Sequence, residues 1–201
     1  MAQGDIIEEN RSCMVEELEL WFCEPVECVK ELLSNPAFKD YICYTPEHVY
    51  SDSEGRERIF DEMWMADWWW EMQVHQTQSD VKILSIKRPF LWQGNLPEGA
   101  TIAPIILSSD KTQLSVFQGN KSAWPVYLTV GNISKEVRHQ PSAHVTILLG
   151  YLPVAKLECF KESTRSLARY NLFHYCMSKV LATLVKAGKD GIDITYGDGF
   201  T

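Results

Sequence analysis

Apolar residues recur at helical spacing near the start of the chain, between residues 13 and 22. This spacing predicts a first amphipathic helix. Its apolar positions are Met14, Leu18, Trp21 and Phe22. Pro25 can open a second helix, because a proline in the first turn gives up no hydrogen bond. The second helix should end before Pro36, since proline disfavours helical geometry in the residue that precedes it.

Two short runs follow, at residues 47–50 and 56–60, and a polar, glycine-containing turn separates them. This arrangement predicts a β-hairpin. Residues 60–73 are rich in aromatic side chains, including three consecutive tryptophans at 68–70, and they predict a helix. Large aromatic side chains pack in cores, but they also stack on bases or on partner proteins. Packing in the core is the simpler expectation.

The pattern changes to strands after a turn at residues 96–100. Apolar runs predict three strands, at Thr101–Leu107, Ser122–Val130 and Ala143–Leu152. Pro125 within the second run predicts an edge strand or a bulge, because proline donates no ladder hydrogen bond. A long helix over residues 163–187 should follow, with Gly188 as its stop. Residues 192–196 predict a fourth strand.

The pattern therefore divides the chain into three regions. Residues 1–73 are a mainly helical segment with a short hairpin, and residues 96–201 hold the strands and the long helix. Residues 74–95 are an irregular insertion or linker, in which only residues 81–86 resemble a strand. A structureless insertion of this length is uncommon within a compact domain. Translated intron or decayed sequence is therefore the preferred explanation, ahead of a genuine inserted loop.

Composition narrows the functional classes. The chain has 201 residues, 45% of them hydrophobic, and a net charge of −8, which are values of a globular protein. A protein that grips DNA over its whole surface needs concentrated Lys and Arg, so the charge argues against that class. A local basic face and an acidic metal site both stay open. The acidic N-terminus is no signal peptide, the apolar runs are too short to span a membrane, and the six cysteines form no CxxC pairs. We expect an intracellular protein, nuclear or cytoplasmic, that is not secreted.

Two acids follow predicted strands. Asp110 comes after the first strand and Asp198 after the fourth. If these strands lie side by side in parallel, joined by the helical crossover, their ends bring both carboxylates together. Paired carboxylates can hold two divalent cations for in-line displacement at phosphorus. An acid after a strand can equally be a turn or capping residue, so the pattern leaves both interpretations open.

Long strings of the chain resemble the Plavaka transposases, in the order Glu24–Gln73, Gly99–Lys135, Gln140–Phe160 and Arg165–Phe200. This fungal family is similar to the CACTA-type cut-and-paste elements, which have a ribonuclease-H-like core with an acidic triad of the DDE type. The resemblance implies an α/β fold, namely an incomplete ribonuclease-H-like domain preceded by a Trp-rich, mainly helical segment. It also implies that Asp110 and Asp198 are catalytic and bind Mg²⁺ or Mn²⁺. The implied partner is DNA at transposon ends, and a homo-oligomer is compatible with it.

The chain also departs from the family pattern. The third acid is expected beyond Thr201, Asn120 stands where an acid is expected, and an N-terminal zinc-finger-like region is missing. We therefore expect a transposase fragment that is inactive alone. The alternative is a non-enzymatic module, derived from a transposon, that binds nucleic acid or protein through the Trp64–Trp70 surface.

Weaker candidates lie around these acids. Asp193 is a rival for the second acid, one step back from the strand tip. Lys111 could reach a phosphate or could be a solvated lysine. Further candidates are His144 and His174 as proton shuttles, and Arg165, Arg169 and Lys179 as contacts to the DNA backbone. Structural histidines and a charged outer helix face are the default explanations for these five.

Overall fold

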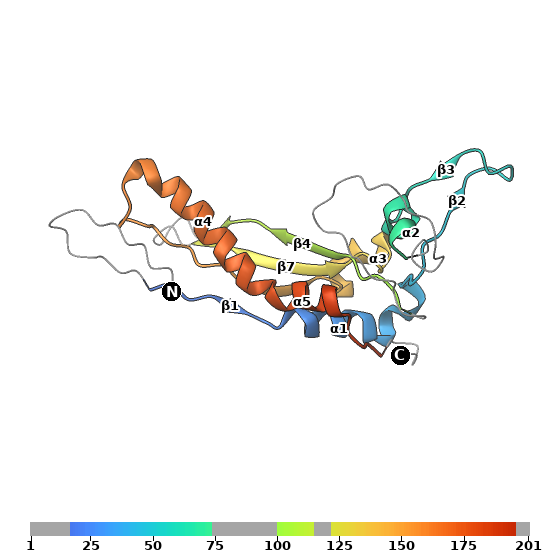
Figure 1. Ribbon diagram of the computed structural model, residues 1–201, viewed down its shortest axis with the longest axis horizontal. Coiled ribbons are helices and arrows are strands. Elements are labelled where there is room, and N and C mark those ends of the chain that lie inside the picture. Colours follow the sequence, from blue (N-terminus) through green and yellow to red (C-terminus); the bar gives the residue numbers. More distant parts are fainter. Residues whose placement is uncertain (1–16, 74–99, 115–121, 196–201) are drawn as a thin grey trace. The chain divides into compact units, whose positions relative to one another are not determined.

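The computed structural model describes residues 17–73, 100–114 and 122–195 (Figure 1). The chain divides into two units, and three of the boundaries between them fall inside secondary-structure elements. The described part of unit 1 comprises residues 17–28, 107–114, 122–128 and 147–191. The described part of unit 2 comprises residues 29–73, 100–106, 129–146 and 192–195.

A four-stranded antiparallel sheet has the order β1-β8-β7-β4. Its strands are β1 (Trp21–Phe22), β4 (Ile105–Ser109), β7 (Pro125–Val130) and β8 (Ile147–Tyr151). Both β1 and β7 pair with β8 in the antiparallel sense. The Ser109 hydroxyl donates to the Pro125 carbonyl over 2.8 Å, and the Gly131 N–H donates to the Pro104 carbonyl over 2.8 Å. The end of β4 thus contacts the start of β7, and the residue before β4 contacts the residue after β7, so these two strands are antiparallel neighbours as well.

The predicted first helix is wrong over its described residues. Trp21 and Phe22 pair with Tyr151 and Gly150, and the Cys23 N–H donates to the Leu149 carbonyl over 2.8 Å. A Cβ at position 150 would lie 2.3 Å from the Trp21 carbonyl oxygen, so the missing side chain permits this close approach. Four apolar residues at helical spacing did not outweigh a ladder partner that lies far away in the sequence.

The second predicted helix is confirmed as α1 (Pro25–Ser34). Its apolar stripe is buried, with Val29, Leu32 and Leu33 each no more than 2% exposed. The helix ends before the proline as expected. Asn35 then caps a 3₁₀ helix, η1 (Pro36–Tyr41), by accepting from the Ala37 N–H over 3.0 Å.

The predicted hairpin is confirmed, with β2 (Val49–Tyr50) antiparallel to β3 (Arg58–Ile59). The aromatic helix is broken into η2 (Met63–Met65) and α2 (Asp67–Gln73), because Ala66 between them is extended. Trp64 is 8% exposed and Trp69 is fully buried. Core packing is thus confirmed for these two tryptophans.

The strand containing Pro125 has the predicted bulge, since its register with β8 shifts between Val126 and Tyr127. The strand is not an edge, because β7 lies between β8 and β4. Proline is tolerated here because it is the first residue of the strand. The third predicted strand begins later than expected, after the 3₁₀ helix η3 (Pro141–Ala143).

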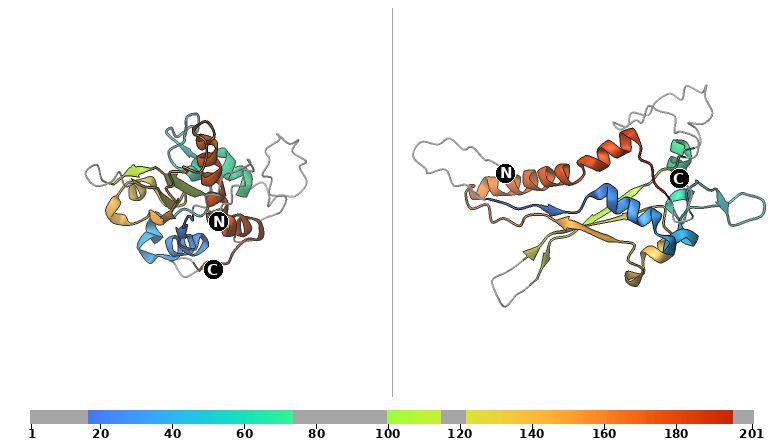
Figure 2. Two further views of the ribbon diagram at one scale, coloured as in Figure 1. Left: turned by 90° about the vertical axis from the view of Figure 1, so that its left-hand side faces the viewer. Right: turned by 90° about the horizontal axis from the view of Figure 1, so that it is seen from below.

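The predicted long helix is two helices, α4 (Glu162–Val180) and α5 (Ala182–Asp190), that meet at Leu181. Gly188 lies inside α5 and does not stop it. Gly191 stops it instead, with φ of 75°, a backbone conformation that favours glycine. Phe173 of α4 stacks on Trp124 with ring centroids 5.2 Å apart, which fixes the helix against the segment before β7 in the same unit. Figure 2 shows α4 running alongside the N-terminal strand of that unit.

Each unit has its own buried apolar cluster. In unit 1 it includes Val126, Leu128, Leu149, Leu152, Cys176 and Val180. In unit 2 it includes Leu32, Leu33, Trp69, Val130, Ile133 and Val145. The remaining elements are β5 (Thr112–Gln113), β6 (Ser122–Ala123) and α3 (Lys135–Arg138).

Candidate functional site

Asp110 lies directly after β4 and is exposed. The chain continues into β5, which pairs with β6 so that Thr112 faces Ala123. The hairpin made by β4 and β7 is thus extended by β5 and β6, and Asp110 sits at the junction of the two paired parts. Among the described residues no cation forms an ion pair with this carboxylate.

The second predicted acid, Asp198, lies outside the described residues. Its rival Asp193 lies in residues 192–195, which form no strand. The placement of Asp193 one step back from a strand tip therefore fails, because residues 192–195 are not in a strand. The predicted fourth strand is not formed over these residues, and within the described sheet β4 pairs with β7 alone. An alternating stretch becomes a strand only when a neighbour offers its backbone groups.

No metal-binding group of three His, Cys, Asp or Glu side chains occurs within residues 17–73, 100–114 and 122–195. The described chain therefore does not bring Asp110 together with two further side chains of these types. Lys111 is exposed beside it, and either role predicted for that lysine stays open.

The two candidate histidines lie in different settings. His144 has φ of 54° at the end of η3 and is exposed. His174 packs its ring on Tyr170, with centroids 4.1 Å apart, and meets Phe173 edge-on at 5.3 Å. These ring contacts agree with a structural role for His174 on the surface of α4, which is the default expectation from the sequence.

The cysteines of the described chain are free thiols. Cys28 and Cys176 are buried, and burial raises the pKa of the Cys176 thiol. The Cys43 thiol donates to the Thr45 carbonyl over 3.0 Å. Its pKa is raised first by burial and then by the negative charges of Glu47 and Glu62, against a smaller lowering effect of the Thr45 backbone. A thiol held in its neutral form is a poor nucleophile and a poor metal ligand.

Two polar anchors in unit 2 had no signal in the sequence. Glu62 accepts the Lys135 backbone N–H over 2.7 Å and the Arg138 guanidinium over 3.2 Å, so it caps α3 from 73 residues away. The buried Asn132 donates through Nδ2 to the carbonyls of Cys43 and Ile102, each over 3.0 Å. Neither residue lies in a local motif that could have identified its partners, because every contact is long-range.

Unit 1 also contains an apolar groove of about 400 Å³ between α4 and the N-terminal strand. Its lining residues are Leu18, Leu20, Phe22, Pro153, Leu172, Tyr175, Cys176 and Lys179. The lining holds no carboxylate and no imidazole, and its polar side chains are Tyr175, Cys176 and Lys179.

Within the described residues no helix is both long and apolar enough to cross a membrane. No curated protein and no solved structure matches the chain. The family model described as Plavaka transposase matches residues 1–201, which is the whole sequence. On this match, together with the mixed α/β fold that carries Asp110 at the end of β4, the chain belongs to the Plavaka transposase family.

Proposed function

We propose that residues 96–201 are a ribonuclease-H-like region of a CACTA-type DNA transposase, with Asp110 as the first acid of its metal site. The observation that carries the proposal is the position of Asp110. It follows β4, the edge strand of the β8-β7-β4 meander, and α4 comes next in the chain after β8. A strand added beside β4 after the helices would place its end near Asp110. Asp198 is the acid proposed for that position.

The chemistry would be cleavage and transfer of a phosphodiester. Asp110 fits a ligand of Mg²⁺ or Mn²⁺, because it is an exposed carboxylate without a cation partner in the described chain. Bound divalent ions would relieve the repulsion between Asp110 and Asp198 and supply the charge stabilisation of an in-line displacement. Lys111 is next to Asp110 in the chain and could hold a phosphate oxygen as a point charge.

Two acids of a triad hold metal weakly, so we propose that the 201-residue chain alone neither cleaves nor joins DNA. Calorimetry with Mn²⁺ tests the site. Weak binding by the unmodified chain should be lost in Asp110→Ala and in Asp198→Ala. The matched control is Asp190→Ala, which removes an exposed carboxylate at the end of α5 and should bind Mn²⁺ unchanged. Equal isotherms for Asp110→Ala and the unmodified chain would remove Asp110 from the site, and strand cleavage by the chain would overturn the proposed inactivity.

A second candidate function is a non-enzymatic binding module, and the exposed aromatic residues of the hairpin favour it. Phe60 is 61% exposed and Tyr50 is 42% exposed. Trp64 and Trp69 are buried, so these two tryptophans offer little surface to a partner. The hairpin and the Trp-rich helix are acidic, which favours a protein over a nucleic acid as the partner. Under this function Mn²⁺ would not bind at all.

A further inference from the structure

Charge is distributed unevenly along the chain. The acidic arm, defined as residues 47–73, has eight acidic and two basic residues. The basic helices, defined as α4 and α5, have five basic and two acidic residues. The chain as a whole carries −8, so the basic helices oppose the sign of the rest of the protein.

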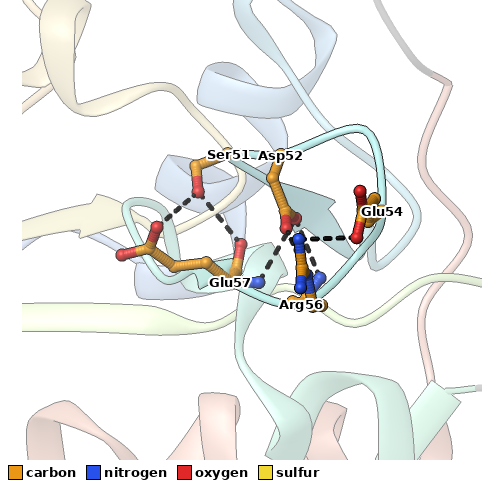
Figure 3. Close-up of polar contacts among 5 residues, drawn as sticks. All are labelled: Ser51, Asp52, Glu54, Arg56 and Glu57. Carbon is orange, nitrogen blue, oxygen red and sulfur yellow. Dashed lines mark hydrogen bonds and ion pairs between the residues drawn. The ribbon is translucent and has the colours of Figure 1, made fainter.

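Several basic residues of unit 2 form ion pairs with carboxylates, which neutralise their positive charge. Figure 3 shows Arg56 between Asp52 and Glu54 at the turn of the hairpin. Within the described part of unit 2 the other ion pairs are Arg58–Asp67, Lys135–Asp61 and Arg138–Glu62. These cations balance the protein's own acids and have little charge left for an external anion.

The basic helices differ in this respect. Arg169, Lys186 and Lys189 are exposed, and within the described chain none of them forms an ion pair. Lys179 is exposed as well and lies over the Tyr175 ring at 5.3 Å from its centroid, a contact that leaves its charge intact. Arg165 is less available, because it is half-buried and donates to the Phe160 carbonyl over 3.3 Å.

We propose that Arg169, Lys179, Lys186 and Lys189 form a surface that contacts the phosphates of duplex DNA. The inference rests on the proposed function, which makes DNA the substrate, and it adds which surface meets the duplex. Free cations are what phosphates bind, since each contact releases condensed counterions. The four residues are spread along α4 and α5, and α4 alone is about 28 Å long at 1.5 Å per residue. The acidic arm would be repelled by the same duplex.

The experiment compares two double variants that have the same net charge. Lys186→Gln with Lys189→Gln removes two cations from α5. Lys39→Gln with Arg56→Gln removes two exposed cations from unit 2 and is the matched control. Binding to a fluorescent 20-base-pair duplex of random sequence is followed by anisotropy across a salt titration in EDTA.

We expect the α5 variant to bind more weakly and to lose about two units of slope in log K against log salt, at about 0.9 per phosphate contact. The control should keep the slope of the unmodified chain. Equal losses in both variants would show that overall charge alone governs binding, and no binding by the unmodified chain at low salt would also overturn the proposal. Circular dichroism confirms that each variant is folded.

Failure here and failure of the proposed function can be told apart. Asp110→Ala should bind the duplex normally in EDTA, because no metal contributes under these conditions. If Asp110→Ala loses Mn²⁺ binding but the α5 variant keeps its full salt slope, the proposed metal site is supported and the proposed DNA surface is wrong. If the α5 variant loses its slope while Mn²⁺ binding is independent of Asp110, the DNA surface is supported and the metal site is wrong.

Discussion

The acidic arm and the basic helices are both charged, but only the arm uses its charges to hold itself in place. Besides the buried Trp64 and Trp69, the arm is fixed by ion pairs and long-range hydrogen bonds, with Glu62 and Arg58 at its centre. The helices are fixed by apolar contacts, namely the Trp124–Phe173 stack and the buried Cys176 and Val180. Charge used internally for structure is unavailable for binding. This contrast is the reason why we propose the helices as the surface that meets an anion.

The largest expected effect is on the arm. Glu62→Ala should lower the free energy of unfolding by about 3–5 kcal/mol, because it leaves the Arg138 guanidinium without its carboxylate in a nearly buried site. The Glu62 side chain is 7% exposed and that of Arg138 is 17% exposed. Urea denaturation measures the change. Glu54→Ala, at an exposed position, is the control and should change stability by less than about 1 kcal/mol. A loss as small as that of the control would show that the arm is not held by this network.

A smaller effect is expected in the helices. Phe173→Leu keeps an apolar side chain but removes the ring that stacks on Trp124. The loss should be about 1 kcal/mol, the usual worth of an aromatic pair beyond its buried area. Thermal unfolding gives the measurement, and the loss should not depend on salt. A strongly salt-dependent loss would contradict the apolar origin of this anchor.

The free cations should contribute almost nothing to stability. Arg169→Gln should change the free energy of unfolding by no more than about 0.5 kcal/mol, as expected for an exposed side chain without partners in the described structure. The same variant should weaken duplex binding in the anisotropy assay. A large stability loss would show that Arg169 serves the fold, and the contrast with the arm would then disappear.

The smallest expected effect is the pH response of the hairpin turn. Partial desolvation raises the pKa of Asp52. The hydrogen bonds from the Arg56 and Glu57 N–H groups and from the Arg56 side chain together lower it by more, so the pKa lies below its ordinary value. A carboxylate with a depressed pKa stabilises the fold above its ordinary pKa, and this stabilisation is lost as pH falls through the depressed value. The protection factors of the Arg56 and Glu57 amides, which are their exchange rates relative to the intrinsic rates at each pH, should therefore stay constant from pH 7 to about pH 4 and fall below that. Asp52→Asn should remove the dependence.

Local chemistry was enough to predict several elements. The Pro25 start and Pro36 stop bound α1, and the polar turn at residues 51–55 identified the hairpin. Pro125 predicted a bulge, which lies one residue further along. In each case a proline or a turn restricts the backbone directly, so a few neighbouring residues contain the whole cause.

Elements that need a distant partner were predicted poorly. Trp21 and Phe22 had helical spacing but became a strand beside Gly150. Residues 192–195 alternate like a strand, yet they form none. The position of Asp110 after a strand was predicted correctly, but proximity to a second acid stays a prediction, since Asp198 lies outside the described residues.

The sequence by itself determined the family, the helix bounded by two prolines, the hairpin and the placement of Asp110 at the end of a strand. Only the tertiary structure decided which charges are neutralised. Glu62 meets Arg138 across 76 residues, whereas Arg169 meets no acid within the described chain. The physical reason is range: dihedral preferences act between neighbours, but an ion pair or a ladder depends on where the rest of the chain places its partner.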